Sequence, residues 1–374
     1  MSTLARTDNS ILARWWWTVD RWNLAAVAVL AMTGAVLALA ASPPVALRLG
    51  LDTYYFASRQ VLYLGIGLFV VVCASLLSPK GVRRLAMAVL AGSMMLMVAV
   101  LAVGPEIKGA TRWLSFGAMS LQPSEFVKPA LAVTAAWFFA QARLQEGYPG
   151  NLVATGLFLM VAALLLMQPD VGMTMVVAAV WAVQFFLAGL PIVMVMGIGL
   201  AFLMASVGAY FTFGHVQARV DRFFDPSAGE GYQVMRSLDA FHNGGLTGRG
   251  PGEGRVKEVL PDAHTDFIFA VAGEEFGMLV CVAIVGLFAF VVIRGLSRAY
   301  KDDNLFVLLA SAGLLVQFAV QAMINLASTL HLIPPKGMTL PFVSYGGSST
   351  VAIALGFGMM LALTRLRPGE GGVR

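Results

Sequence analysis

Ten apolar stretches alternate with polar connections along this chain. A bilayer core about 30 Å thick requires about 20 apolar residues per helix, a length that most of these stretches approach. They predict ten membrane-spanning helices, at residues 24–41, 61–78, 85–103, 127–142, 152–167, 171–189, 191–213, 267–293, 304–327 and 349–364. Nine or eleven remain alternatives, because the fourth stretch is short and only Gly189-Leu190-Pro191 separates the sixth from the seventh.

This pattern predicts an all-α, polytopic membrane protein with one membrane domain over residues 1–374. The composition agrees, since 59% of the residues are hydrophobic and only 12% are charged, whereas soluble domains carry about 25% charged residues. Lipid must therefore solvate most of the surface. In a membrane protein, the formal net charge of +5 informs on orientation through the placement of the charges on the two sides of the membrane. It does not indicate a nucleic-acid partner, and none is expected.

Lys and Arg are distributed unevenly between the two sides of the predicted bundle. With ten crossings, the side of the two termini has thirteen of them and the short connections of the opposite side have six. The positive-inside rule places residues 1–22 and 365–374 in the cytoplasm. The large loop at 214–266, between the seventh and eighth helices, is then extracytoplasmic. If its six Lys/Arg are counted with the outer side, the difference in positive charge between the two sides nearly disappears.

The first apolar stretch and the two cysteines argue against a signal peptide, a disulfide and a zinc site. Residues 24–41 are longer than the apolar part of a signal peptide, which is about 7–15 residues, so they are read as a membrane anchor. Cys73 and Cys281 both lie inside apolar stretches, which argues against a disulfide or a zinc site.

The first polar group on the outer side spans residues 108–128. Pro123 fits the first turn of a helix, and Glu125 and Lys128 are three residues apart, close enough to pair on one helix face. Two interpretations stay open. One is an interfacial helix start with a snorkelling lysine; the other is an anionic-headgroup site formed by Arg112 and Lys128, with Glu125 holding the lysine.

The next outer connections are Gln168-Pro169-Asp170, which also fits a simple tight turn, and the large loop. Six glycines crowd into residues 244–254. Such a segment can cradle a pyrophosphate or form a re-entrant loop, but no Lys-Ser/Thr follows it, so it is not a Walker A loop.

Asp266 stands where the large loop enters the eighth apolar stretch. On a helix that starts there, Ala270, Gly273 and Gly277 form a stripe of small residues, which can admit a lipid chain or another helix. Glu274 and Glu275 would lie about 12–14 Å further in by helical rise. Acids inside a membrane are functional candidates by default, with structural ion pairs as the alternative.

The last polar group precedes the tenth helix and includes Lys336, Ser344 and Tyr345. Neither a Gly-x-Ser-x-Gly motif nor a Ser/His/Asp order surrounds it, which argues against a serine hydrolase. A helix-entry loop with hydroxyl caps is the simpler interpretation.

Five of these segments, taken in order, resemble the SEDS family of bacterial peptidoglycan polymerases (shape, elongation, division and sporulation). The resemblance covers nearly the whole chain. The septal FtsW branch, in its alphaproteobacterial form, fits better than the RodA elongation branch, because of residues 335–341, residues 260–264 and Trp15-Trp16-Trp17. The matching motifs are Arg112-Trp113 with Pro123-Ser124-Glu125-x-x-Lys128, Gln168-Pro169-Asp170, Gly250-x-Gly252 through His264-Thr265-Asp266, Glu274-Glu275, and Pro341-Phe342-x-Ser344-Tyr345-Gly346-Gly347-Ser348-Ser349.

The resemblance implies polymerisation of lipid II into β-1,4 glycan strands with inversion, and it places the catalytic aspartate of the family on Asp266, as general base. Mg²⁺ or Mn²⁺ could assist the leaving pyrophosphate. Substrate contacts are expected from Arg112, Trp113, Glu125, Lys128, His264, Lys336 and Ser344. Supporting roles are expected for Asp170, Glu258, Glu274 and Glu275.

The implied setting is the division septum of the inner membrane, with lipid II, a class B penicillin-binding transpeptidase and other divisome proteins as partners. Three other functions stay open: a RodA-type elongation polymerase, a lipid II flippase and a non-enzymatic division scaffold. A transporter should hold its polar groups near the middle of the bilayer, whereas here most of them lie at one rim.

Overall fold

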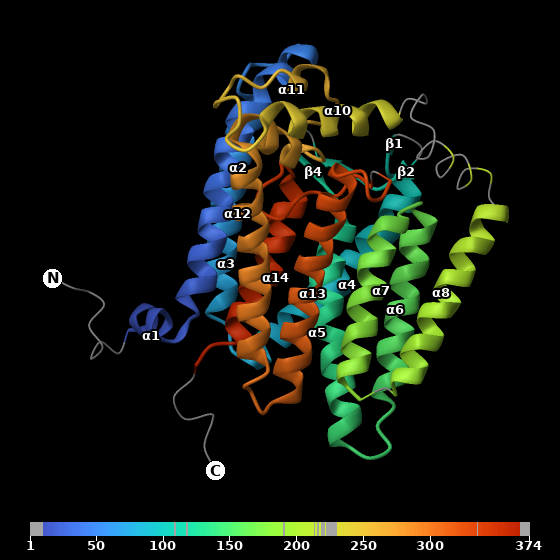
Figure 1. Cartoon of the computed structure of the whole chain (residues 1–374). Helices are drawn as coiled ribbons and strands as arrows, with labels where there is room; N and C mark the ends of the chain where they lie inside the picture. Colours follow the sequence, from blue (N-terminus) through green and yellow to red (C-terminus); the bar gives the residue numbers. More distant parts are fainter. Residues whose placement is uncertain are drawn as a thin grey trace.

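The computed structural model describes residues 10–107, 110–116, 119–189, 191–212, 214, 217, 221, 230–334 and 336–366. The chain is a helical bundle with two small antiparallel hairpins (Figure 1). The helices are α1 (Ile11–Thr18), α2 (Arg21–Arg48), α3 (Tyr55–Ser75), α4 (Pro79–Val103), α5 (Pro123–Leu144), α6 (Gly150–Met167), α7 (Val171–Leu187), α8 (Ile192–Thr212), α10 (Glu230–Gly244), α11 (Val256–Val259), α12 (Ile268–Ala299), α13 (Leu305–Thr329) and α14 (Gly347–Leu363).

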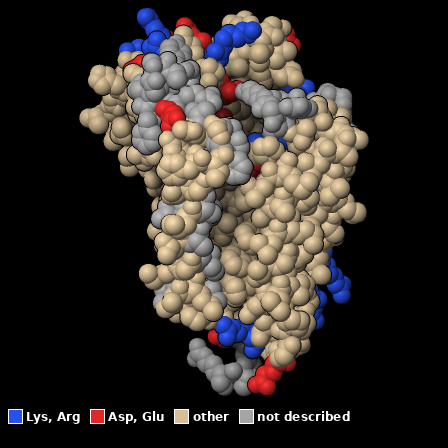
Figure 2. All heavy atoms as spheres, turned by 90° about the vertical axis from the view of Figure 1, so that its right-hand side faces the viewer, with Lys and Arg blue, Asp and Glu red and all other residues tan. Residues whose placement is uncertain are grey.

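Every apolar stretch predicted from the sequence coincides with one of the helices α2–α8 and α12–α14. Of these, α2, α3, α4, α6, α12 and α13 are long and apolar enough to cross a membrane, and α7 and α14 are shorter apolar helices. On the face seen in Figure 2, charged side chains gather toward the two ends and the middle band is almost free of them. The multi-pass helical architecture is confirmed, and ten as the number of crossings stays a prediction.

The segment between α4 and α5 contains the hairpins, which the sequence did not predict. Strand β1 (Glu106–Ile107) pairs with β2 (Ala110–Thr111), and β3 (Leu114–Phe116) pairs with β4 (Met119–Leu121). Strands this short are easily missed because period-2 alternation needs about four residues to show.

Helix starts follow local chemistry. The carboxylate of Asp20 accepts a hydrogen bond from Trp22 N at the start of α2, and the Asp170 carboxylate accepts one from Met173 N at the start of α7. The Asn304 side chain does the same for α13. Each of these caps satisfies one of the backbone N–H groups that a helix leaves unpaired in its first turn.

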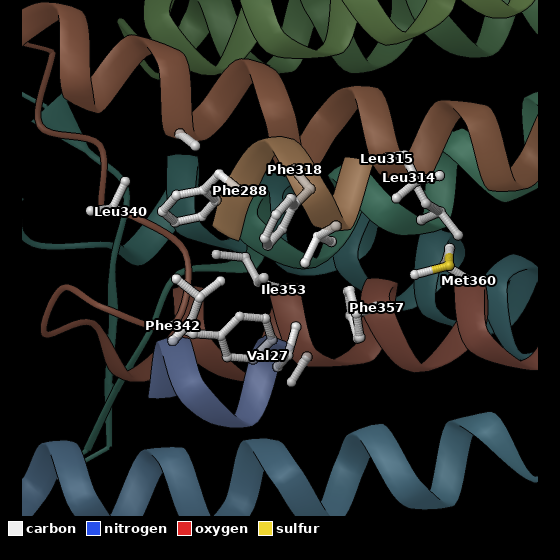
Figure 3. Packing of buried hydrophobic residues seen from close by; sticks show 14 of the residues in the cluster. Val27, Phe288, Leu314, Leu315, Phe318, Leu340, Phe342, Ile353, Phe357 and Met360 are labelled. Atoms are coloured by element: carbon white, nitrogen blue, oxygen red, sulfur yellow. The ribbon is translucent and has the colours of Figure 1, made fainter. Parts of the chain in front are cut away.

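Helices α5 and α13 form the centre of the bundle. Helix α5 contacts α4, α6, α7, α13 and α14. Beside them, Figure 3 shows Phe288 of α12, Phe318 of α13 and Phe357 of α14 packed with Phe342, which comes from the loop before α14. The rings of Phe342 and Phe357 meet edge to face, with centroids 6.0 Å apart. Aromatic packing therefore anchors that loop to the bundle.

Helices α10 and α11 and the glycine-rich segment 244–254 form an outer cap. The cap covers the end of the bundle opposite the connection between α12 and α13 (Figure 1). Its links to the bundle include two hydrogen bonds: Ser237 Oγ donates to Thr329 O (2.8 Å), and Arg48 Nη2 donates to Leu260 O, directly after α11 (3.0 Å). The rings of Phe241 in α10 and Phe269 in α12 also pack together, with centroids 5.7 Å apart.

Helix α12 is interrupted at Gly277, which corrects the expectation of one continuous helix. Gly277 has φ 81° and ψ 179°, a conformation open to glycine and strained for other residues. Met278 N beyond the break donates to Gly245 O of the outer cap (2.9 Å). The carbonyls of Glu274 and Glu275, at the end of the first piece, accept from Arg249 N and Gly250 N. The outer cap thus satisfies the backbone groups that the break exposes.

Candidate active site

Asp266 lies in the turn just before α12 and is half-buried. Its main chain is held on two sides: its N–H donates to Asp262 O (3.1 Å), and its carbonyl accepts from Asn325 Nδ2 of α13 (3.0 Å). The same amide nitrogen of Asn325 donates to Met338 O (2.6 Å). One side chain of α13 therefore fixes Asp266 against the segment 336–340.

That segment, which leads toward α14, is the structural centre of the site. A Cβ placed on Gly337 would lie 3.8 Å from Asp266 Oδ2, so the carboxylate is beside this glycine. A Cβ placed on Gly172, in the first turn of α7, would lie 3.7 Å from Lys336 Cβ. The Cβ of Lys336 therefore lies at the start of α7, and Lys336 directly precedes the glycine that is beside the predicted base.

The predicted pairing of Glu125 and Lys128 is confirmed. Their charged atoms are 2.8 Å apart, and the two side chains are only 5% and 1% exposed. Lys128 Nζ also donates to Gln321 Oε1 of α13 (2.9 Å), and Gln321 Nε2 donates to Thr339 O (3.3 Å). A buried ion pair leaves each charge in need of further hydrogen bonds. Gln321 supplies one to Lys128 and links α5 to the segment 336–340.

Hydroxyl groups hydrogen-bond within the segment 336–340 and between it and the residues that follow. Thr339 Oγ1 and Ser349 Oγ are 2.6 Å apart, and the backbone N–H of Leu340 donates to Ser344 Oγ (2.8 Å). Ser344 O in turn accepts from Gln60 Nε2 of α3 (3.0 Å). Ser344 therefore holds the loop shape, in line with the interpretation of hydroxyl caps.

Arg112, which is partly exposed, sits over the α6–α7 connection. Its Nε donates to Gln168 O (3.1 Å), another guanidinium nitrogen donates to Pro169 O, and Nη1 is 3.5 Å from Asp170 Oδ2. Asp170 also caps α7, so it both starts that helix and holds the arginine. Trp113 follows on the chain and is half-buried.

His264 is 93% buried within an aromatic group. Its ring is 4.2 Å from that of Phe56 and 5.4 Å from that of Tyr345, and its carbonyl accepts from Tyr345 N (3.0 Å). Burial lowers the pKa of His264 to about 4, Asp262 opposes that shift, and Arg48 adds to it. The ring is therefore neutral near pH 7, and burial likewise raises the pKa of Tyr345.

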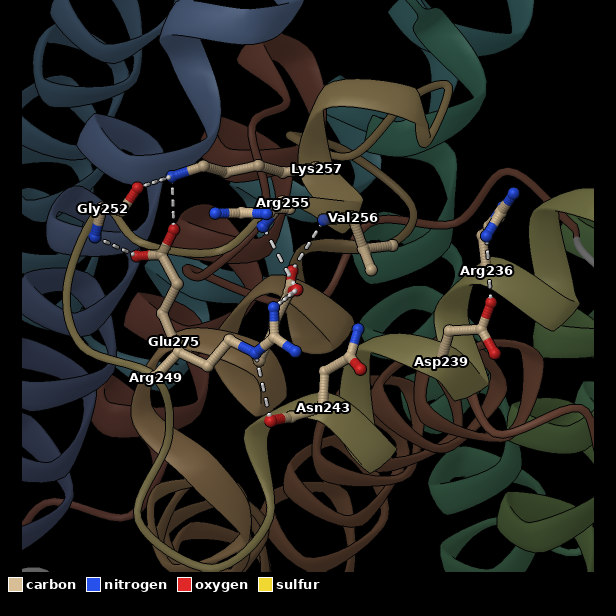
Figure 4. A network of polar contacts seen from close by, with 10 residues as sticks. Arg236, Asp239, Asn243, Arg249, Gly252, Arg255, Val256, Lys257 and Glu275 are labelled. Carbon is tan, nitrogen blue, oxygen red and sulfur yellow. Dashed lines mark hydrogen bonds and ion pairs between the residues drawn. The ribbon is translucent and has the colours of Figure 1, made fainter.

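Glu274 and Glu275 lie on the first piece of α12, and their carboxylates bind the outer cap. Figure 4 shows Glu275 with Gly252 and Lys257. Glu274 accepts from Arg255 N and Val256 N (3.1 and 2.9 Å). Glu275 accepts from Gly252 N (2.9 Å) and from Lys257 Nζ. Since both carboxylates bind residues of the outer cap, the contacts favour the structural role that the sequence left open as the alternative for these two acids.

The glycines of the outer cap use their N–H groups internally. Those of Gly245, Gly248, Gly250 and Gly252 donate to protein oxygens. The pyrophosphate-cradle interpretation is therefore wrong for these four, and a folded loop is the correct one. Glu258 is exposed on α11.

The stripe of small residues after Asp266 receives a helix and not a lipid chain. A Cβ on Gly244 of α10 would lie 1.9 Å from Gly273 O, and one on Gly273 would lie 2.3 Å from the ring of Phe241. Helix α10 thus packs against the first piece of α12 at backbone contact distance.

No group of three or more His, Cys, Asp and Glu side chains is arranged to hold a metal ion within the described ranges. The acids near Asp266 are separately engaged, Asp170 with Arg112 and Glu125 with Lys128. These side chains do not form an all-protein cage for a divalent cation.

The arrangement joins segments that are distant in sequence, and comparison with known proteins gives it a family. A family model described as "Cell cycle protein", named for FtsW, RodA and SpoVE, matches residues 21–368. The chain belongs to the FtsW/RodA/SpoVE family. The expected SEDS membership is therefore confirmed, and all the predicted site residues lie inside the matched part.

Relatives in the FtsW/RodA/SpoVE family carry FtsW names. A protein of Caulobacter vibrioides named "Probable peptidoglycan glycosyltransferase FtsW" is 47% identical over 369 residues, covering 98% of this chain and 95% of that protein. A protein of the same name from Escherichia coli O6:H1 is 34% identical over 358 residues, 92% and 86% of the two chains. These names agree with the expected FtsW branch.

Solved structures of the FtsW/RodA/SpoVE type share the fold. A chain from a structure titled "Structural coordination of polymerization and crosslinking by a peptidoglycan synthase complex" matches with a TM-score of 0.77 and 28% identity, over 93% of this chain and 98% of that one. The crystal structure of RodA from Thermus thermophilus matches with a TM-score of 0.70 and 28% identity, over 93% and 97%.

Sequence reasoning missed the two residues that assemble the site, Gln321 and Asn325. Both are on α13 and both are almost fully buried. A signal was present, since two amides one helical turn apart inside an apolar stretch must find polar partners. Their partners, Lys128 and the carbonyls of Asp266 and Met338, come from other parts of the chain.

Proposed function

We propose that this protein is a peptidoglycan glycosyltransferase of the FtsW branch that polymerises lipid II. The observation that carries the proposal is Asp266, a half-buried carboxylate fixed through its main chain by Asn325. It lies beside Gly337, the neighbour of Lys336. An acid packed against the segment that carries a lysine, at the outer end of the bundle, suits a reaction on a membrane-anchored sugar phosphate.

In the proposed reaction, Asp266 acts as general base. It takes the proton from the 4-hydroxyl of the acceptor lipid II as that oxygen attacks the anomeric carbon of the donor glycan. The new C–O bond forms on the face opposite the leaving group, the bond to undecaprenyl pyrophosphate breaks, and the α-linked donor becomes a β-1,4 linkage. A base must come within about 3 Å of the proton it accepts.

The cations have separate parts in this proposal. Lys336 and Arg112 compensate the charge of the leaving pyrophosphate, and Arg112 is the partly exposed member of its pair with Asp170. Lys128 is buried against Glu125 and Gln321. Its charged group is engaged by these two side chains, so Lys128 supports the site through Gln321. Direct contact between Lys128 and the substrate stays a prediction.

A requirement for Mg²⁺ or Mn²⁺ also stays a prediction. Since the nearby acids do not form an all-protein cage, such an ion would depend on oxygens of the pyrophosphate itself. The step proposed for Asp266 does not involve it.

The proposed setting is the cytoplasmic membrane at the division septum, with both termini in the cytoplasm. The proposed partner is a class B penicillin-binding transpeptidase, together with other divisome proteins. A RodA-type role in elongation is the alternative. A fluorescent fusion concentrated at midcell supports the septal role, and one spread along the sidewall contradicts it.

The decisive experiment uses purified Asp266→Asn protein, with its transpeptidase partner if required, and lipid II. Because general bases contribute about 10²–10⁴ in rate, glycan formation should fall by that factor while the thermal unfolding profile is unchanged. Asp262→Asn is the matched control. Asp262 is in the same turn at φ 53°, a conformation that asparagine tolerates.

Normal polymerisation by Asp266→Asn would refute the assignment of the base. If the wild-type protein forms no glycan but moves lipid II headgroups across vesicle membranes, the flippase interpretation holds instead. If it does neither, a scaffold is the remaining interpretation.

A further inference from the structure

A basic recess is formed by residues at the end of α12. This end of the helix points away from the outer cap (Figure 1). Its volume is about 440 Å³. It is lined by Phe290, Ile293, Arg294, Ser297, Arg298 and Lys301. The recess is at the opposite end of α12 from Asp266 and takes no part in the proposed reaction.

The charges of the recess are only partly neutralised. The buried carboxylate of Asp20 contacts the Nε atoms of Arg294 (2.9 Å) and Arg298 (3.1 Å). The lining has three positive side chains and the Asp20 carboxylate beside them is negative, which gives these groups a net charge of +2. Asp302 and Asp303 follow Lys301 in the chain but do not line the recess. The two arginines keep side-chain exposures of 31% and 24%, so they remain accessible beside the recess.

Asp20 also fixes where the arginines lie. It caps α2 through Trp22 N (3.1 Å), so its carboxylate cannot move without loosening the start of that helix. Two guanidinium groups held one helical turn apart form a preorganised site for an oxyanion, because little side-chain entropy remains to be lost.

An exposed apolar stripe leads up to the recess along the same helix face. Its members are Leu279, Val282, Phe290 and Ile293, which are separated by three, eight and three positions and are exposed between 39% and 65%. Ser297 and Lys301 continue the spacing at intervals of four. One face of α12 therefore changes from apolar to cationic at the recess.

We propose that this recess binds the headgroup of an anionic phospholipid, with an acyl chain along the stripe. A phosphate oxygen suits the paired arginines, and the net charge of +2 favours a headgroup that carries net negative charge. A zwitterionic headgroup brings its own cation to the same place and loses that advantage. The lipid is a structural ligand that joins the start of α2 to the end of α12.

The test is native mass spectrometry of the full-length protein from nanodiscs of phosphatidylglycerol and phosphatidylcholine in equal parts. Wild-type protein should retain phosphatidylglycerol preferentially. Lys301 is exposed and outside the Asp20 contacts, so Lys301→Gln should fold normally and bind this lipid about fivefold more weakly. Lys80→Gln, which removes an exposed lysine from the start of α4, is the matched control and should bind as the wild type does.

Three results would overturn the proposal. Equal retention of the two lipids would show that charge does not select the ligand. Equal losses in Lys301→Gln and Lys80→Gln would show a diffuse attraction and no site. Displacement of the lipid by millimolar sn-glycerol 3-phosphate would show a site for a soluble phosphate, in which the apolar stripe has no part.

Discussion

Two sets of acids in α12 and the turn before it are held in opposite ways. Glu274 and Glu275 are each 1% exposed and fixed through their carboxylates, which accept backbone N–H groups and contact Lys257. Asp266 is half-buried and fixed through its main-chain carbonyl and N–H. An acid whose carboxylate is the anchor serves the fold, whereas an acid anchored by its backbone can present its carboxylate to a substrate.

Removing the charge of Glu275 tests the structural half of this comparison. Glu275→Gln leaves Lys257 buried without its counter-charge, so we expect a loss of about 3–5 kcal/mol in the free energy of unfolding. Thermal unfolding in detergent measures it. The double variant Glu275→Leu with Lys257→Met, which removes both charges, should recover part of the loss. A single variant as stable as the wild type would show that the carboxylate does not anchor the outer cap.

The second prediction concerns His264, which connects the Asp266 turn to Tyr345. Its pKa of about 4 in the folded protein is below the unfolded value of about 6.5, so the unfolded chain binds more protons between these values. Stability is therefore complete above about pH 6.5 and falls by up to about 3 kcal/mol as the pH drops toward 4.

The measurement for His264 is the difference in melting temperature between pH 7 and pH 4.5. His264→Gln should reduce that difference, and His242→Gln, which changes an exposed histidine of α10, should leave it unchanged. The same pH dependence in wild type and His264→Gln would assign the acid sensitivity to other groups.

A third prediction tests the anchoring of Asp266 through its backbone. Asn325→Ala leaves the carbonyls of Asp266 and Met338 without their shared donor, which should cost about 1–3 kcal/mol of stability. Since the base is then less well positioned, kcat for glycan formation should fall more than KM changes. Ser328→Ala, one turn along α13, is the control. Unchanged kcat in Asn325→Ala would mean that Asp266 is positioned by other contacts.

The smallest effect is expected at Glu258. It is exposed on α11, and Glu258→Gln should change stability by less than about 0.5 kcal/mol and leave polymerisation intact. A tenfold loss of activity with unchanged folding would restore the supporting role that the family resemblance implied.

The sequence predicted the helices well because apolar length alone determines a membrane-spanning segment. It also predicted the Glu125–Lys128 pair, since three residues of helix separate them. It failed at Gly277, where a glycine inside an apolar stretch does not reveal whether the helix continues. It failed at Gln321 and Asn325 because their partners come from distant segments, and separation in sequence carries no information about such contacts.

The break at Gly277 is bonded to the outer cap on both of its sides. The carbonyls of Glu274 and Glu275 accept from the cap before the break, and the N–H groups of Met278 and Leu279 donate to the cap after it. A Cβ at position 277 would lie 2.4 Å from both Gly248 N and Leu246 O of the outer cap. The cap therefore has room only for a glycine at the break, so the path of the large loop and the shape of α12 depend on the same residue.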